Sequence, residues 1–367
     1  MVSTIVSAGN LAAKLLLDLL EVYTPSGREY EAIPVLEEWS RRLGLLMSVD
    51  SSGSIRLRPP GWGEAQPLIM LASHLDTVPG MLPVRVMEGA IHGRGAVDAK
   101  GPLSAMIVGL ALASESGIPC AAEVAALSGE EADSPGAWGL VRRGEVAPFV
   151  VIGEPTGGDG VAISYRGSLK LAIECRSGSG HSSSVGGGAG WALVDALNVV
   201  RGSLPEAVLT MISGGSAPNV TPEAAEAVLD LRFESDAASI INRVSIVCRD
   251  VDMTSGCGCS RVELTSPIKV SLSNIVSRTL VSAIRRQGVR PRIVKKLGTS
   301  DMNILGRVAQ GIAAYGPGDP RLAHTPSEKI GVADLELAAK IYAETILTLC
   351  HMVDGGHTKG LLGTQTT

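Results

Sequence analysis

Three short apolar runs, separated by helical and polar segments, constrain the fold more than any other feature of this sequence. They cover residues 68–73, 124–128 and 149–152, and turn residues follow each run. Apolar runs of this length are typical of strands that are buried on both faces. A longer apolar stretch at 101–113 begins with Gly-Pro, which suits the first turn of a helix, and lies between the first two runs. This alternation predicts an α/β fold with a mostly parallel central sheet.

The composition supplies material for a large core and argues against two classes of partner. Hydrophobic residues make up 45% of the 367 residues and the mean hydropathy is +0.25. The stretch at 101–113 is shorter than the about 18–20 residues that a membrane-spanning helix needs. The formal charge of −5 disfavours nucleic acid as the main ligand. No cationic segment precedes the first apolar stretch, so we expect no signal peptide and a cytoplasmic location.

The length and a change of composition suggest two domains, one inserted into the other. Glycine and serine become frequent in the middle of the chain, strands are then expected to dominate, and strand–helix alternation returns afterwards. We expect a catalytic domain formed by 1–161 and 273–367, with an inserted α+β lid or dimerisation domain at 162–272. The residues from Thr358 onwards are expected to form a disordered tail.

The cysteines do not suggest a disulfide framework. Six of them are spread over the whole chain, too few and too scattered for the pattern of small secreted proteins. The one close pair, Cys257 and Cys259, lacks the second pair or nearby histidine that a zinc ribbon needs. We therefore expect two free thiols in this loop.

Acidic residues and histidine follow directly after each predicted buried strand. Because the carboxyl ends of strands form the ligand-binding edge of an open α/β sheet, we expect these side chains to converge. One further aspartate lies in the loop before the predicted helix, and one further histidine precedes Thr-Pro late in the chain. Histidine and carboxylate ligands without cysteine suit zinc, cobalt or manganese. The candidates are His74, Asp76, Asp98, Glu130, Glu131, Glu154 and His324.

Each candidate has an ordinary structural explanation when it is taken alone. Asp98 could cap a helix, His324 could be a surface loop residue, and paired glutamates are common in solvated turns. The combination favours a metal site, because several carboxylates at one sheet edge are costly to bury unless cations compensate them. Motifs of other enzyme classes are missing from the sequence. The absence of Gly-x-Ser-x-Gly disfavours a serine hydrolase, that of lysine followed by serine or threonine a P-loop phosphotransferase, and that of His-Glu-x-x-His a zincin.

Four spaced motifs resemble those of the dinuclear metallopeptidase family of acetylornithine deacetylases, succinyl-diaminopimelate desuccinylases, aminoacylases and glutamate carboxypeptidases. They are Ser-His-Leu-Asp-Thr-Val-Pro-Gly80, Gly-Arg-Gly-Ala-Val-Asp-Ala-Lys-Gly101, Ser-Gly-Glu-Glu131 and Gly-Glu-Pro155. With the late histidine, the resemblance covers nearly the whole chain. It implies two divalent metal ions, zinc before cobalt or manganese, one held by His74, Asp98 and Glu154 and the other by Asp98, Glu131 and His324.

The resemblance also implies roles that fit the chemistry of these residue types. Asp98 would bridge the two ions, whose charges lower the pKa of a shared water. Glu130 would be the general acid/base that takes the proton of this water and hands it to the leaving amine. Asp76 would accept a hydrogen bond from the far nitrogen of His74 and fix its tautomer.

Three residues of the inserted domain complete the implied site. His181, in Gly-His-Ser-Ser, resembles the family histidine that reaches into the partner subunit's site, which implies a homodimer. Asn219 and Arg232 lie in segments that resemble those used to hold a substrate carboxylate, for which a guanidinium offers a bidentate fork. Closure of the lid is expected to bring all three over the metals. The alternatives are a histidine in a flexible loop and a strand-edge arginine.

The motifs Gly-Thr-Ser-Asp-Met-Asn303 and Tyr315-Gly-Pro-Gly-Asp-Pro-Arg-Leu-Ala-His-Thr-Pro-Ser-Glu328 resemble one branch of the family most closely. This branch releases lysine or ornithine from the acidic amino-group carrier protein LysW, by hydrolysing the isopeptide to the carrier's terminal glutamate γ-carboxyl. The segment 285–296 holds six basic residues and no carboxylate, so it is either a docking surface for this carrier or a solvated helix end. An N-acetyl-lysine or N-acetylornithine deacetylase would share every metal ligand, and a non-catalytic binding module of the same fold is a further alternative.

Overall fold

The computed structural model describes residues 7–62, 65–178, 180–181, 183 and 188–354, so the tail predicted from Thr358 lies outside the described residues. The chain forms two compact units. Unit 1 comprises Met1–Ser164, Lys269–Lys295 and Ser300–Thr367, and unit 2 comprises Tyr165–Ile268 and Lys296–Thr299. Within the described ranges, no helix combines the length and apolar character needed to cross a membrane.

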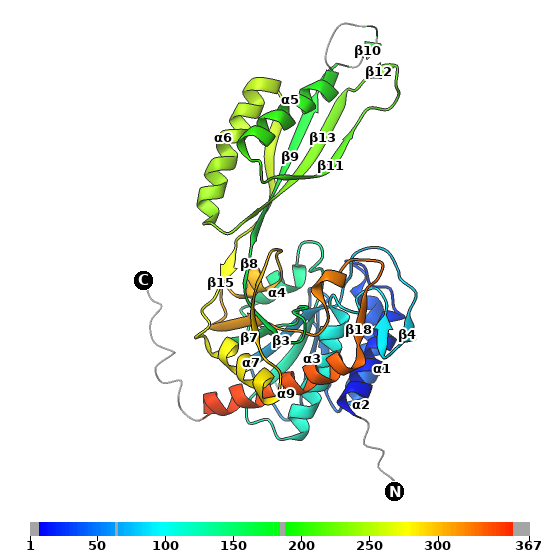
Figure 1. Ribbon diagram of the computed structural model, residues 1–367, viewed down its shortest axis with the longest axis vertical. Helices are drawn as coiled ribbons and strands as arrows, with labels where there is room; N and C mark the ends of the chain where they lie inside the picture. The colour runs from blue at the N-terminus through cyan, green and yellow to red at the C-terminus, as the bar shows by residue number, and fades with distance from the viewer. Residues whose placement is uncertain (1–6, 63–64, 179, 182, 184–187, 355–367) are drawn as a thin grey trace. The chain divides into compact units, whose positions relative to one another are not determined.

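A nine-stranded sheet forms the centre of unit 1 (Figure 1). Three predicted strands, β3, β6 and β7, lie side by side with every residue buried, and β3 is parallel to both of the others. Strand β17 extends the parallel part, whereas β1, β2 and β8 pair antiparallel with their neighbours. The α/β class is confirmed, and the sheet is mixed rather than parallel throughout. In spatial order the strands are β1 (Leu46–Val49), β2 (Ile55–Arg58), β6 (Ala122–Leu127), β3 (Ile69–His74), β7 (Phe149–Ile152), β17 (Gly311–Ala314), β8 (Gly160–Tyr165) and β15 (Ile268–Lys269), with β16 (Arg292–Lys296) also paired with β8.

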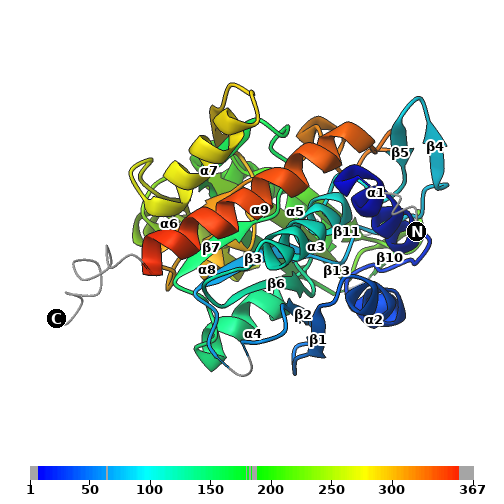
Figure 2. The same cartoon turned by 90° about the horizontal axis from the view of Figure 1, so that it is seen from below.

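Long helices pack against this sheet and against one another, and Figure 2 shows α1, α3 and α9 side by side. These helices are α1 (Ala8–Leu20), α3 (Lys100–Glu115), α7 (Ile275–Arg286) and α9 (Val332–Asp354). Helix α3, which contains the apolar stretch noted in the sequence, is buried on nearly all sides. At Gly109 a Cβ would lie 2.8 Å from the Cβ of Tyr342, so glycine permits the close contact between α3 and α9.

Smaller elements connect these layers. They are the 3₁₀ helices η1 (Glu29–Ala32) and η2 (Pro320–Leu322), the helices α2 (Ile33–Arg42), α4 (Pro135–Arg143) and α8 (Met302–Leu305), and a three-stranded sheet in the order β18 (Lys329–Gly331), β5 (Ala90–His92) and β4 (Arg85–Met87). The tight turn between β5 and α3 carries Asp98, whose position is therefore set by both elements.

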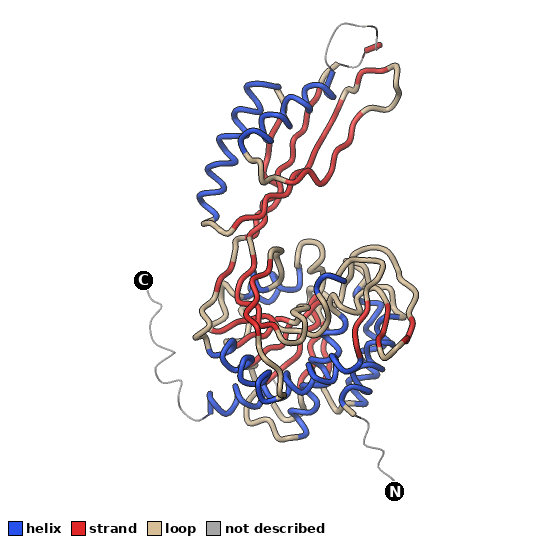
Figure 3. Tube along the Cα trace, in the orientation of Figure 1, coloured by secondary structure: helices blue, strands red, loops and turns tan. Residues whose placement is uncertain are grey.

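Unit 2 is a four-stranded antiparallel sheet with two helices on one face (Figure 3). The strand order is β11 (Val208–Gly214), β13 (Ala224–Phe233), β9 (Gly167–Arg176) and β14 (Gly258–Thr265), the helices are α5 (Gly188–Ser203) and α6 (Ala237–Ser255), and a short ladder pairs β10 (Gly180–His181) with β12 (Val220–Thr221). The expectation that strands dominate this segment is wrong for α6. Its buried Ile240, Val244, Val247 and Val251 recur at helical spacing, and Asp236 caps its first turn.

The cysteine prediction is also wrong, because all six cysteines form disulfides. Cys257 pairs with Cys175 and Cys259 pairs with Cys248, so this loop holds no free thiol. Cys120, just before β6, pairs with Cys350 in α9. Antiparallel pairing of β14 with β9 brings Cys257 opposite Cys175, a contact across 82 residues that spacing along the sequence does not indicate. Each such bond typically stabilises a fold by about 2–4 kcal/mol.

Candidate metal centre

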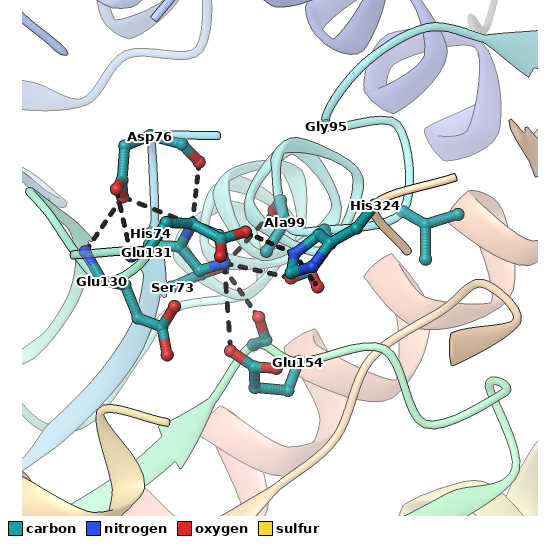
Figure 4. Close-up of polar contacts among 12 residues, drawn as sticks. Ser73, His74, Asp76, Gly95, Ala99, Glu130, Glu131, Glu154 and His324 are labelled. Carbon is teal, nitrogen blue, oxygen red and sulfur yellow. Dashed lines mark hydrogen bonds and ion pairs between the residues drawn. The ribbon is translucent and has the colours of Figure 1, made fainter. Parts of the chain in front are cut away.

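The residues that follow β3, β6 and β7 meet at one edge of the central sheet (Figure 4). His74 is the last residue of β3, Glu130 and Glu131 follow β6, and Glu154 follows β7. Parallel pairing of the three strands brings their carboxyl ends into register, which places these side chains together. His324 comes from the loop between β17 and β18 and reaches the same cluster.

His74 is the centre of a first group of candidate ligands. Its ring is buried, and its Nε2 atom lies 3.1 Å from Asp98 Oδ1 and 3.9 Å from Glu154 Oε1. Its Nδ1 atom lies 2.9 Å from the Asp76 main-chain oxygen and 3.4 Å from Asp76 Oδ1. One atom each from His74, Asp98 and Glu154 lies within 4.8 Å of the others, which suits a single cation.

A second group forms around His324 and shares Asp98 with the first. His324 Nε2 lies 2.7 Å from Glu131 Oε1 and 3.4 Å from Asp98 Oδ2. Asp98 therefore directs one carboxylate oxygen toward each histidine. The atoms of Asp98, Glu131 and His324 again lie within 4.8 Å of one another. A carboxylate between two such groups has the arrangement that a bridging ligand needs.

The electrostatics of the cluster require positive charge. Hydrogen bonds to Asp98 and Glu131 raise the pKa of His324 to about 10. Burial by itself would lower the pKa of His74, but Asp76 and Asp98 raise it well above its ordinary value. No lysine or arginine in the described ranges forms an ion pair with Asp98, Glu130 or Glu131. Divalent cations would supply the same compensation, so the donor set fits the implied metal ions.

Asp76 fixes the position of Glu130 and Glu131. Its fully buried carboxylate accepts the backbone N–H groups of both glutamates at 3.1 Å and the Ser26 hydroxyl at 2.6 Å. Burial raises the pKa of Glu130 well above its ordinary value, and the carboxylates of Glu154 and Asp301 add to this rise. A carboxylate with a raised pKa is better suited to accept a proton than a free one.

Sequence reasoning missed Glu328, which holds the loop that carries Asp98. Its buried Oε1 accepts the backbone N–H groups of Gly95, Val97 and Asp98 at 3.0–3.1 Å, and its Oε2 accepts Arg94 Nη1 at 2.8 Å. Its position four residues after His324, in a motif already noted, is a signal that could have identified it.

Asp301 is a second residue that was missed. It is buried near Ser134 in the loop after Glu131, and burial raises its pKa to about 7. The segment before α8 thus lies next to the loop of the two glutamates.

The three predicted substrate-binding residues lie in unit 2 and do not all come together. His181 is exposed in β10 and pairs with Val220, so it lies beside Asn219. Arg232 is near the other end of β13, where it donates to Asp230 at 2.7 Å and to Thr299 at 3.1 Å. The ten residues of β13 span on the order of 30 Å. His181 and Asn219 thus lie together and apart from Arg232, and the expectation that closure of the lid brings all three over the metals stays a prediction.

Comparison with known families identifies the class that this fold and site define. The model of "Peptidase family M20/M25/M40" matches residues 70–348, which is well over half of the chain. The chain belongs to this peptidase family.

Individual proteins give a finer comparison. A protein of Aeropyrum pernix, provisionally named LysW-lysine/LysW-ornithine hydrolase, is 49% identical over 351 residues, 96% of this chain and 99% of that protein. The LysW-lysine/LysW-ornithine hydrolase of Saccharolobus islandicus is 38% identical over 90% of this chain and 94% of its own length. Among solved structures, a tripeptidase from Staphylococcus aureus has a TM-score of 0.80 at 20% identity, covering 94% of this chain and 100% of that one. At this identity the likeness concerns the fold.

Replacing Glu328 should weaken metal binding without removing a ligand. In Glu328→Ala the N–H groups that hold the Asp98 loop lose their acceptor, and we expect metal affinity to fall about 10- to 100-fold. Glu328→Gln keeps an acceptor oxygen, so its metal affinity should fall less than that of Glu328→Ala. Titration of zinc into metal-free protein, with circular dichroism as the control for folding, tests this. Wild-type affinity in Glu328→Ala would contradict the positioning role.

Proposed function

We propose that this protein hydrolyses the isopeptide bond that joins lysine or ornithine to the terminal glutamate γ-carboxyl of the carrier protein LysW. The observation that carries this proposal is the 49% identity, over nearly the whole of both chains, with a relative named for this activity. The reaction would end a biosynthetic route to lysine or arginine. The cluster at the sheet edge is the chemical basis. It contains three overlapping candidate ligand groups, and we assign two of them, which share Asp98, to the metal ions and the remaining carboxylate, Glu130, to proton transfer.

We assign the residues of the metal centre as the sequence predicted. His74, Asp98 and Glu154 would hold one divalent ion and Asp98, Glu131 and His324 the other, with zinc the first choice and cobalt or manganese as alternatives. The distances from Asp98 to both histidines support its bridging role. When bound, the two ions would polarise the scissile carbonyl and lower the pKa of the attacking water.

Glu130 would carry the proton through the reaction. It accepts a proton from the water as the water oxygen bonds to the isopeptide carbonyl carbon, and it delivers this proton to the α-amine as the C–N bond breaks. The two backbone hydrogen bonds to Asp76 hold Glu130 and its neighbour Glu131 in place during both steps. Asp76 also lies against His74 Nδ1, which supports its role in fixing the tautomer of that ring.

The central experiment compares substrates with and without the carrier. Purified, metal-loaded protein should release lysine or ornithine from LysW conjugates, lose this activity with a chelator, and act poorly on N-acetyl-lysine and N-acetylornithine. Glu130→Gln should keep both metals and lose turnover by about 10²–10⁴-fold. The reverse substrate preference would make the protein a small-molecule deacetylase, and metal binding without any turnover would favour a non-catalytic module.

We propose that LysW, an acidic protein, docks on the basic segment 285–296. Two of the six basic side chains are already paired with carboxylates in the structure. Arg286 pairs with Glu344 and Arg292 pairs with Asp159, both at 2.6 Å. Arg285, Arg290 and Lys295 are exposed, and none of them forms an ion pair with a described residue. These three cations are the ones available to an acidic partner.

Reversing these three charges should therefore affect only the carrier-linked substrate. In the triple variant Arg285→Glu, Arg290→Glu and Lys295→Glu, we expect KM for the LysW conjugate to rise about tenfold at low salt, with kcat little changed. The matched control is Lys14→Glu, Arg201→Glu and Arg249→Glu, which changes the net charge equally at exposed positions elsewhere. A rise in KM of equal size in both variants would contradict docking on this segment.

We further propose a homodimer formed through the outer edge of β11. This strand is at one end of the unit 2 sheet, and its large apolar side chains are between 45% (Leu209) and 64% (Met211) exposed. An exposed apolar edge strand is a template for pairing with another chain. A dimer would also explain the separation of His181 and Asn219 from Arg232, because the two groups could serve the metal centres of different subunits.

Charged residues on β11 should give a monomer. We expect Met211→Lys with Ile212→Lys to halve the mass measured by light scattering and to abolish turnover, since His181 would lose its partner site. The control is Val262→Lys on β14, the opposite edge strand, where the side chain is 62% exposed. A dimer in the β11 variant would refute this interface.

We also infer a cytoplasmic location, in keeping with a biosynthetic enzyme that acts on a carrier protein. The three disulfides are compatible with this inference, because intracellular proteins of hyperthermophilic archaea are rich in disulfides.

A further inference from the structure

A cavity lies beside the loop that carries Glu130 and Glu131. It has a volume of about 470 Å³ and is formed by the segment around η1, the turn between β1 and β2, and the loop after β6. The residues that matter for its chemistry are Ser26, Glu29, Tyr30, Ile33, Val49 and Asp133. None of the assigned metal ligands lines this cavity, which we call the Glu29 pocket.

Glu29 gives the pocket a buried carboxylate with one oxygen to spare. The residue is 5% exposed, and its Oε1 accepts the backbone N–H of Gly129 at 2.8 Å. No hydrogen bond or ion pair from any described residue reaches its Oε2, this atom is not among the fully buried ones, and Glu29 lines the pocket. A carboxylate this buried is costly unless its second oxygen finds a donor, and a cationic donor compensates it best.

The rest of the lining suits a cation with an apolar stem. Asp133 adds a second carboxylate, and the described lining includes no lysine or arginine, so anions are disfavoured. Ile33 and Val49 supply an apolar wall, and the ring of Tyr30 is exposed and able to contact a cation through its face. An alkylammonium or alkylguanidinium ion matches both the charge and the apolar surface.

Two hydrogen bonds connect the pocket to the catalytic loop. Gly129, which donates to Glu29, directly precedes Glu130. Ser26 lines the pocket and donates to Asp76, which in turn accepts the backbone N–H groups of Glu130 and Glu131. We propose that the Glu29 pocket is a second ligand site, which binds a small organic cation, and that its occupancy changes the metal affinity of the adjacent centre. This inference is independent of which amide substrate the enzyme uses.

The test uses n-butylguanidinium, which stays protonated and is a poor metal ligand, and its neutral analogue n-butylurea. Calorimetric titration into the zinc-loaded full-length protein should show saturable binding of the cation and at least tenfold weaker binding of the urea. Glu29→Gln keeps an acceptor for the Gly129 N–H but removes the charge, and should weaken cation binding at least tenfold. Equal affinity for the two probes, or no saturable binding of the cation, would overturn the proposal.

A second variant tests whether misfolding explains a loss of binding in Glu29→Gln, and it also tests whether the cation binds in the pocket. Val49 is 44% exposed, so Val49→Trp should fold normally, block the pocket and abolish binding, whereas the control Val86→Trp on β4 should bind as wild type does. Binding that survives in both Glu29→Gln and Val49→Trp would place the cation elsewhere and refute the site. Zinc affinity should shift at least threefold with saturating n-butylguanidinium in the wild type and not in Val49→Trp. An unchanged zinc affinity in the wild type would refute the coupling.

Discussion

The rest of the candidate metal centre depends on the hydrogen bonds that the buried carboxylate of Asp76 accepts. It joins three segments that are distant in sequence, because it accepts Ser26 before η1 and the backbone of Glu130 and Glu131 after β6, while its own residue lies against His74. Burial by itself would raise the pKa of Asp76, but the hydrogen bond and charge of His74, followed by the hydrogen bonds from Ser26 and the Glu131 backbone, lower it below its ordinary value. One negative charge thus positions His74, Glu130 and Glu131 together, the residues proposed to bind metal and to transfer the proton.

Much of this centre was accessible from the sequence because it follows a local rule. His74, Glu131 and Glu154 were predicted to meet since each follows a buried strand, and parallel pairing alone brings such positions together. Glu328 and Glu29 were not predicted, because what they do depends on backbone N–H groups in loops that only the folded chain brings near. The disulfides were not predictable from the sequence for the same reason, since Cys120 and Cys350, for example, are 230 residues apart. Helix α6 is different, because the helical spacing of its apolar residues is a local signal that the sequence itself carries.

The basic segment 285–296 carries less unpaired positive charge in the folded protein than its sequence indicates. The segment 285–296 is uniformly basic in sequence, but Glu344 and Asp159 from distant segments neutralise part of it. An arginine held by a carboxylate at 2.6 Å contributes little to the field that a partner encounters. The remaining cations form a smaller and more directional surface than the sequence indicates, which is better suited to orienting a partner than to attracting polyanions in general.

The order of the candidate ligands along the chain has a consequence for how the proposed metal centre is completed. His74, Asp98 and Glu154 all precede unit 2, whereas His324 follows it. During synthesis, the first group is available as soon as β7 has emerged, but the second must wait until the whole inserted unit and β17 have been made. Under the proposed ligand assignment, a nascent or C-terminally damaged chain would therefore hold one cation and not the other, and such a half-assembled centre would lack hydrolytic activity until His324 was added.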